Sequence, residues 1–160
     1  SNLKQKEFPT IDPKVSKSAD RSKKFAVLII DDSKTDRVIM ARYLGQAWPF
    51  EHDCVIRYAV DGRDAIEQMR TTRFAMILLD WKLPGMGGGE VLRQIRRSGV
   101  HIPVIVLSGL EREAIEENLD NLGAAFLNKN EMNSSTFHDA IAASLKLMGI
   151  KSPPSASQPS

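Results

Sequence analysis

Between residues 25 and 149 the chain alternates short apolar runs with segments of helical periodicity. An apolar run of roughly four to eight residues without polar alternation is typical of a strand that is covered on both faces. Short apolar runs predict strands over residues 25–30, 55–59, 75–79, 102–107 and 124–127, and three of these runs show no alternation. A segment with apolar residues spaced by three and four follows each of them, which predicts five strand–helix units.

The apolar positions of the helical segments predict which face each helix buries. The expected inner residues are Val38, Ile39, Tyr43 and Leu44 in the first helix; Ala65, Ile66 and Met69 in the second; Val91, Leu92 and Ile95 in the third; Ile115, Leu119 and Leu122 in the fourth; and Phe137, Ile141, Leu145 and Met148 in the fifth. Asp32 or Ser33 is expected to cap the first helix, and the fifth is expected to begin at Ser134 or Ser135.

This order of elements predicts one α/β domain, a doubly wound five-stranded parallel sheet with helices on both faces. The expected strand order is flavodoxin-like, 2-1-3-4-5, which makes the first, third, fourth and fifth strands neighbours. Sheets of this type bind ligands beyond the carboxyl ends of their strands, so the residues that end the strands are the ones to inspect for function.

Composition sets the boundaries of the domain and narrows the class of protein. Residues 1–24 are polar and begin with Ser-Asn, typical of a cleaved tag, and residues 150–160 form a Pro/Ser tail. Both segments are expected to be flexible or disordered around a domain at 25–149. The net charge of +2 argues against nucleic acid as a partner. A single cysteine, Cys54, and the lack of a long apolar stretch favour a cytoplasmic protein that contacts no membrane.

Polar residues end four of the predicted strands. The first strand leads into Asp31 and Asp32, the third into Asp80, the fourth into Ser108 and the fifth into Lys129. Because parallel strands end at the same edge of a sheet, we expect these side chains to gather in one crevice.

This set of side chains suits phosphoryl transfer. Carboxylates around one point repel each other unless a cation neutralises them, and a set of oxygen ligands favours Mg²⁺. An aspartate can itself be the nucleophile and form an aspartyl phosphate, while a lysine and a hydroxyl group neutralise and position the phosphoryl group.

The strand-end segments also carry a family resemblance. The pair Asp31-Asp32, "LLDWKLPGMGG", "VIVLSG" and "AFLNK" resemble, in order and spacing, the receiver domain of two-component response regulators, over residues 25–149. The resemblance implies that Asp80 is the phosphoacceptor, that Asp31, Asp32, Asp80 and the backbone carbonyl of Lys82 bind magnesium, that Ser108 and Lys129 contact the phosphoryl group, and that Phe126 is an aromatic switch residue.

The resemblance further implies partners and an output. The phosphoryl donor would be a histidine kinase or a histidine phosphotransfer protein. The response would be a changed protein-binding surface, formed by the fourth helix, fifth strand and fifth helix, that is read by a downstream protein target. Homodimerisation through the same elements is left open.

Four residues depart from the usual family pattern. Gly87 stands in place of an aspartate, Asn130 in place of a proline that follows a cis bond, Trp81 beside Asp80 is bulkier than usual, and Lys82 occupies a position that tunes phosphoryl lifetime. Gly87 and Asn130 keep open the alternative of a phosphorylation-independent receiver that acts as a scaffold. A second alternative, an aspartate-based phosphatase, is disfavoured because Lys82 stands where such enzymes have a second acid.

Overall fold

The computed structural model describes residues 24–51 and 53–150, so the predictions about the terminal segments concern residues 1–23 and 151–160, which lie outside the described residues. Its strands are β1 (Lys24–Ile30), β2 (Asp53–Ala59), β3 (Met76–Asp80), β4 (Val104–Ser108) and β5 (Ala124–Asn128). Its helices are α3 (Lys34–Ala47), α4 (Gly62–Thr71), α5 (Gly88–Arg97) and α6 (Ser134–Leu147), with short 3₁₀ turns η1 (Arg112–Ala114) and η2 (Lys129–Glu131).

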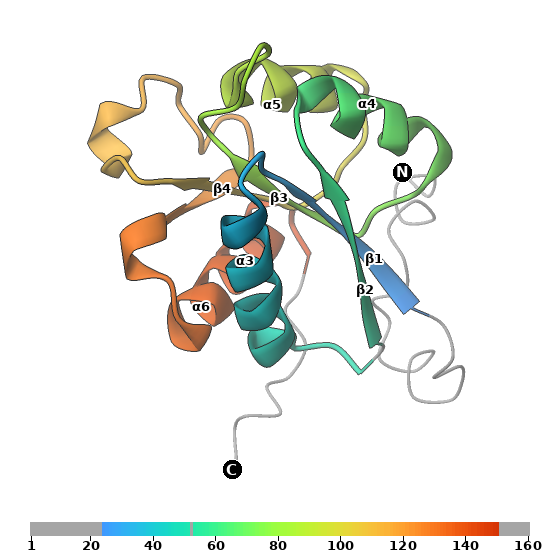
Figure 1. The fold of residues 1–160 in the computed structure, drawn as a ribbon, viewed down its shortest axis with the longest axis vertical. Coiled ribbons are helices and arrows are strands. Elements are labelled where there is room, and N and C mark those ends of the chain that lie inside the picture. Colours follow the sequence, from blue (N-terminus) through green and yellow to red (C-terminus); the bar gives the residue numbers. More distant parts are fainter. Residues whose placement is uncertain (1–23, 52, 151–160) are drawn as a thin grey trace.

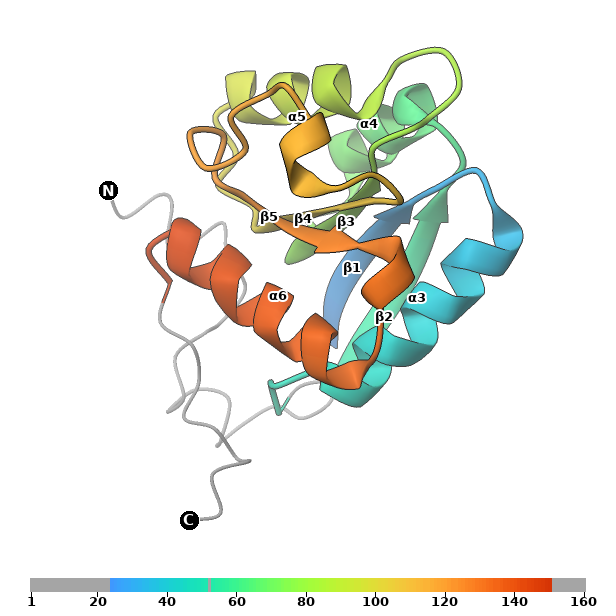
Figure 2. The same cartoon turned by 90° about the vertical axis from the view of Figure 1, so that its left-hand side faces the viewer.

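The sheet confirms the predicted fold class. All its strand pairs are parallel, and the order is β2-β1-β3-β4-β5. Helices α4 and α5 cover one face, and α3 and α6 cover the other (Figures 1 and 2). The carboxyl ends of β1, β3, β4 and β5 therefore meet along one edge.

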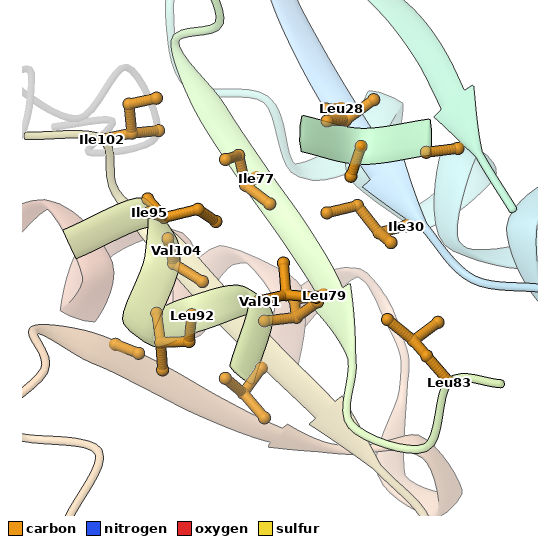
Figure 3. Close-up of a cluster of buried hydrophobic side chains, with 14 of the residues drawn as sticks. Leu28, Ile30, Ile77, Leu79, Leu83, Val91, Leu92, Ile95, Ile102 and Val104 are labelled. Carbon is orange, nitrogen blue, oxygen red and sulfur yellow. The ribbon is translucent and has the colours of Figure 1, made fainter. Parts of the chain in front are cut away.

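Alternation along the strands divides the core into two apolar layers. Leu28 and Ile30 of β1 point toward α4 and α5, whereas Val27 and Ile29 point toward α3 and α6. Figure 3 shows the first layer, in which Leu79 of β3 lies against Val91 of α5. Burial on both faces explains why these strands read as unbroken apolar runs.

The first helix buries a different face from the predicted one. Its buried residues are Met40, Leu44 and Ala47, spaced by four and three, whereas Val38 is 53% exposed. Leu44 was predicted correctly, and Tyr43 is half-buried with its ring stacked on Phe137. The prediction of Val38 was wrong, because a second apolar stripe lies beside the buried one. Ser33 caps the helix as expected, since its Oγ accepts a hydrogen bond from the backbone N–H of Asp36.

The prediction of a fourth helix, between β4 and β5, was wrong. Between β4 and β5 the chain forms only the 3₁₀ turn η1 and a series of turns. Ile115 and Leu119 are nonetheless buried in the layer beneath α5, so their apolar spacing marks inward-facing positions correctly.

Turn-forming residues explain why this segment is not an α-helix. The side chain of Asn118 accepts a hydrogen bond from the backbone N–H of Asn121, and Gly123 has a φ of 67°. Asparagine side chains compete with the helical backbone for its hydrogen bonds, and glycine ends helices in this conformation. The remaining stretch is too short for a stable helix.

One close approach positions the loop after β3. Gly88, at the start of α5, donates its N–H to the carbonyl oxygen of Trp81 at 3.1 Å. A Cβ at Gly88 would lie 2.8 Å from Trp81 Cα and 2.9 Å from the carbonyl oxygen of Asp80. Backbone atoms cannot rotate away, so we expect Gly88→Ala to lower the free energy of unfolding by at least about 1 kcal/mol in urea titrations.

Gly87→Ala is the matched control for this prediction. Gly87 has a φ of −70°, and a Cβ there would meet nothing within 4 Å. The control is expected to unfold at nearly the same urea concentration as the original protein. Equal losses in the two variants would rule out the close approach as the cause.

Candidate functional site

Asp31 and Asp32 follow β1 directly at the carboxyl edge of the sheet. The backbone N–H of Asp31 donates to the carbonyl oxygen of Ala59 at 3.0 Å, which continues the pairing with β2 and buries Asp31 completely. Its Oδ1 accepts a hydrogen bond from the Ser33 N–H at 2.9 Å. Asp32, in contrast, is exposed. The two adjacent acids therefore differ in environment, one fixed inside the site and one at its mouth.

Asp80 ends β3 and completes an acidic cluster. Asp31, Asp32 and Asp80 each place a carboxylate oxygen within 4.8 Å of the others. Asp80 is 5% exposed, and the backbone N–H of Lys82 donates to its Oδ1 at 3.4 Å. Burial, and next the charge of Asp31, raise the pKa of Asp80 from 3.8 to about 6, although Lys129 opposes the shift.

Lys129 neutralises part of this negative charge. Its Nζ lies 2.8 Å from Asp31 Oδ2, 2.8 Å from Asp36 Oδ2 and 3.3 Å from Asp80 Oδ1. Burial by itself would lower the pKa of Lys129, but the hydrogen bonds to Asp31 and Asp36 and the charge of Asp80 raise it. The ammonium group is therefore held in its charged form between three carboxylates.

Asp36 is a site residue that the sequence interpretation missed. It lies in the first turn of α3, where an acid is common because it interacts favourably with the helix N-terminus. In the sequence it looks like any other acid in a first helical turn. Only the structure shows that its carboxylate reaches Lys129.

Ser108 ends β4 next to the acidic cluster. Its neighbour Leu107 is the register partner of Asp80, and its own partner on β5 is Asn128. Ser108 is 1% exposed, and its Oγ accepts a hydrogen bond from the Leu110 N–H at 3.0 Å. The hydroxyl proton is thus available for a second partner at the carboxyl edge.

The remaining predicted residues lie at the periphery of the cluster. Phe126 of β5 is half-buried, pairs with Val106 and packs against the apolar layer beneath α5. Lys82 is exposed on the loop after Asp80. The bond between Lys129 and Asn130 is trans, so the loop after β5 differs from the cis geometry usual where proline follows the lysine.

The donor set of the cluster fits Mg²⁺. The ligating atoms would be carboxylate oxygens, which this ion prefers, and Asp32 is exposed, so water can reach the cluster. The helices described in residues 24–51 and 53–150 are too short or too polar to cross a membrane.

These features define a class of protein: a doubly wound α/β domain with an acidic pocket and a lysine at the carboxyl edge of its sheet. Residues 27–142 match the response regulator receiver domain family, and the chain belongs to this family. It is therefore a signalling domain, and the predicted fold class and family are confirmed.

Curated relatives and solved structures agree with this membership. The chain is 36% identical over 87 residues, 54% of its own length, to a protein-glutamate methylesterase/protein-glutamine glutaminase of Paramagnetospirillum magneticum, of which it covers 23%. It is 30% identical over 98 residues, 61% of its length, to the response regulator MprA of Mycolicibacterium vanbaalenii, of which it covers 39%. The chemotaxis response regulator CheY4 of Vibrio cholerae superposes with a TM-score of 0.64 at 25% identity, covering 77% of this chain and 100% of that one.

The alignments also show how much of these relatives the chain represents. It spans 23%, 26% and 33% of the first three methylesterase relatives, so the esterase activity in their names belongs to proteins that are much longer. What the chain shares with them is the receiver domain.

Proposed function

We propose that this receiver accepts a phosphoryl group on Asp80 and switches a protein-binding surface in response. The observation that carries the proposal is the environment of Asp80. The carboxylate is nearly buried at a strand end, grouped with Asp31 and Asp32, and 3.3 Å from the Nζ of Lys129. Because its pKa is about 6, it is ionised in most molecules above pH 7, as a nucleophile must be.

In the proposed reaction a carboxylate oxygen of Asp80 forms a bond to phosphorus while the phosphorus–nitrogen bond of a donor phosphohistidine breaks. The imidazole keeps the electron pair of that bond and takes a proton from solvent. Lys129 offsets the negative charge that gathers on the phosphoryl oxygens, and the Ser108 hydroxyl donates a hydrogen bond to one of them. Phosphoryl transfer needs mainly this positioning and charge neutralisation.

Magnesium would be held by the carboxylates of Asp31, Asp32 and Asp80 and by the backbone carbonyl of Lys82. When bound, it supplies positive charge between these acids and the phosphoryl oxygens. Without that charge, a phosphoryl group would add its own negative charge to a cluster that already raises the pKa of Asp80.

The phosphoryl donor in this proposal is a histidine kinase or a histidine phosphotransfer protein in the cytoplasm, and the chain promotes its own phosphorylation. The output is a change in contacts with a downstream protein target. Phe126 on β5 would be the aromatic switch residue, because it links the strand that leads into Lys129 to the layer beneath α5. The family's fourth helix cannot contribute here, since that segment contains only η1 and turns.

Intact-mass measurement after incubation with acetyl phosphate and Mg²⁺ tests the proposal. The phosphorus–oxygen bond of the donor breaks, acetate leaves, and we expect the protein to gain one phosphoryl group. Asp80→Asn is expected to gain none, because an amide is a far weaker nucleophile. Omission of magnesium in the presence of EDTA is expected to abolish the gain as well.

A chemotaxis-type receiver phosphorylated in parallel controls for the donor. If the folded protein gains no mass while this control does, the proposal is wrong and the scaffold alternative is favoured. Gain of mass in Asp80→Asn would instead place the acceptor elsewhere. Continuous release of phosphate from phosphomonoesters would favour the phosphatase alternative.

A further inference from the structure

The side chain of Asn128, at the end of β5, joins the two loops that carry Ser108 and Lys129. It is buried, with 4% of the residue exposed. Its Oδ1 accepts a hydrogen bond from the Asn130 N–H at 2.8 Å, and its Nδ2 donates to the carbonyl oxygen of Leu110 at 3.3 Å and to Glu111 Oε2 at 3.4 Å. The identities of these partners fix the orientation of the amide, since a backbone N–H requires the oxygen and a carbonyl requires the nitrogen.

The bonds to Asn130 and Leu110 lead to residues of the proposed phosphoryl site. The Asn130 N–H belongs to the turn η2, whose first residue is Lys129, so Asn128 caps the turn that presents the lysine. Leu110 in turn donates its own N–H to Ser108 Oγ at 3.0 Å. The buried amide of Asn128 is therefore linked to the Ser108 hydroxyl through Leu110, and to the residue that bears the ammonium group, Lys129, through the turn η2.

The segment after Ser108 has few other restraints from regular structure. It contains no α-helix between β4 and β5 within the described chain, and the loop start at Gly109 to Glu111 is exposed. Asn130 adds a further, weaker contact, from its Nδ2 to the carbonyl oxygen of Gly109 at 3.4 Å. These three side-chain contacts on the loop thus come from the two asparagines that flank Lys129, of which Asn130 stands where the usual family loop has a proline.

We propose that Asn128 is a positioning residue for phosphoryl transfer, holding Ser108 and Lys129 in register with Asp80. This inference rests on the proposed function, since it concerns the transfer of a phosphoryl group to Asp80. Asn128 itself does not contact Asp31, Asp32 or Asp80 in the hydrogen bonds described for residues 24–51 and 53–150. It acts on the geometry of the groups around the acceptor and leaves the acidic cluster intact.

Two substitutions test the contacts of the amide, namely the cap of η2 and the link to Leu110. Asn128→Ser keeps a short hydroxyl that can cap η2, because serine is a good N-cap residue, but it is too short to reach Leu110. Asn128→Leu removes both the cap and the link at similar volume. We expect both variants to gain the phosphoryl group from acetyl phosphate about tenfold more slowly than the original protein, since small misplacements of positioned groups have large effects on rate.

A second set of measurements distinguishes positioning from simple loss of stability. The Mg²⁺ dissociation constant, followed by tryptophan fluorescence with the metal alone, is expected to stay unchanged in Asn128→Ser. Hydrogen exchange in peptides that cover residues 108–112 and 128–132 is expected to become faster in the same variant. Asn133→Ser, at the exposed cap of α6, is the control, and it should alter neither the phosphorylation rate nor exchange in these peptides.

The outcomes also separate this inference from the function on which it rests. If the original protein gains no phosphoryl group, the proposed function fails, and the exchange measurement alone decides whether Asn128 fixes the two loops. If the original protein is phosphorylated and Asn128→Ser matches its rate, the positioning role is refuted. Unchanged exchange in both peptides refutes it as well.

Discussion

Lys129→Met is expected to destabilise the metal-free protein by about 3 kcal/mol, because it leaves buried carboxylates without their counter-charge. In the original protein Lys129 Nζ lies 2.8 Å from Asp31, whose side chain is fully buried, and 3.3 Å from Asp80. Methionine keeps the apolar stem of the lysine but cannot offset either charge. Urea unfolding in EDTA measures the loss.

The same substitution is expected to slow phosphoryl gain from acetyl phosphate by about 10²-fold, the usual loss when one group that stabilises developing charge is removed. Two comparisons isolate the cause. Lys146→Met, on the exposed side of α6, should unfold and react nearly as the original protein does. Lys129→Met should cost less stability in an Asp80→Asn background than in the original protein, because one of the unpaired charges is then absent.

If Lys129→Met unfolds at the original urea concentration, the ion pairs seen in the structure contribute no net stability. If it also reacts at the original rate, Lys129 has no role in the transfer. A general packing defect would instead make Lys129→Met equally costly in the original and the Asp80→Asn backgrounds.

The sequence predicted which residues meet at the carboxyl edge of the sheet wherever backbone topology positions them. Asp31 and Asp80 come from the adjacent strands β1 and β3, and Lys129 follows β5, two strands further along the same sheet. A strand end is visible in the sequence as the point where an apolar run stops. Parallel pairing then brings these residues to one edge, whatever their side chains do. The acidic cluster follows from the strand order alone.

The direction of individual side chains could not be predicted from the sequence in the same way. Asp36 and Asn128 both contribute to the site, one through Lys129 and the other through Leu110. In the sequence, Asp36 is an ordinary acid in a first helical turn, and Asn128 is one polar residue in "AFLNKN". Their contacts depend on which way a helix turns and on where a loop from another strand passes, and no local pattern encodes these.

Between β4 and β5 the sequence predicted the buried side chains correctly but the backbone conformation wrongly, since no α-helix forms there. Ile115 and Leu119 have helical spacing and are buried, yet the backbone around them forms turns. Periodicity reports which residues face inward, and turns can meet the same requirement when Asn118 and Gly123 favour them. Burial was therefore predictable here, while backbone conformation was not.

Asp80→Asn is expected to stabilise the metal-free protein by about 3 kcal/mol at pH 7.5, even though it removes the proposed acceptor. The pKa of Asp80 is raised from 3.8 to about 6, first by burial and then by the charge of Asp31. Folding therefore favours the protonated carboxyl group, and keeping it ionised at pH 7.5 costs free energy. Asparagine has the same shape as the protonated acid and carries no charge.

The pH dependence of this gain identifies its cause. A folded-state pKa above the unfolded value means that Asp80 destabilises the fold fully above pH 6 and that this penalty is relieved as the pH falls from 6 toward 4. The difference between Asp80→Asn and the original protein should thus shrink over that interval in urea titrations with EDTA. Asp139→Asn, whose carboxylate is 81% exposed, should show no such trend. A constant difference down to pH 4 would mean that packing, and not the buried charge, separates the two proteins.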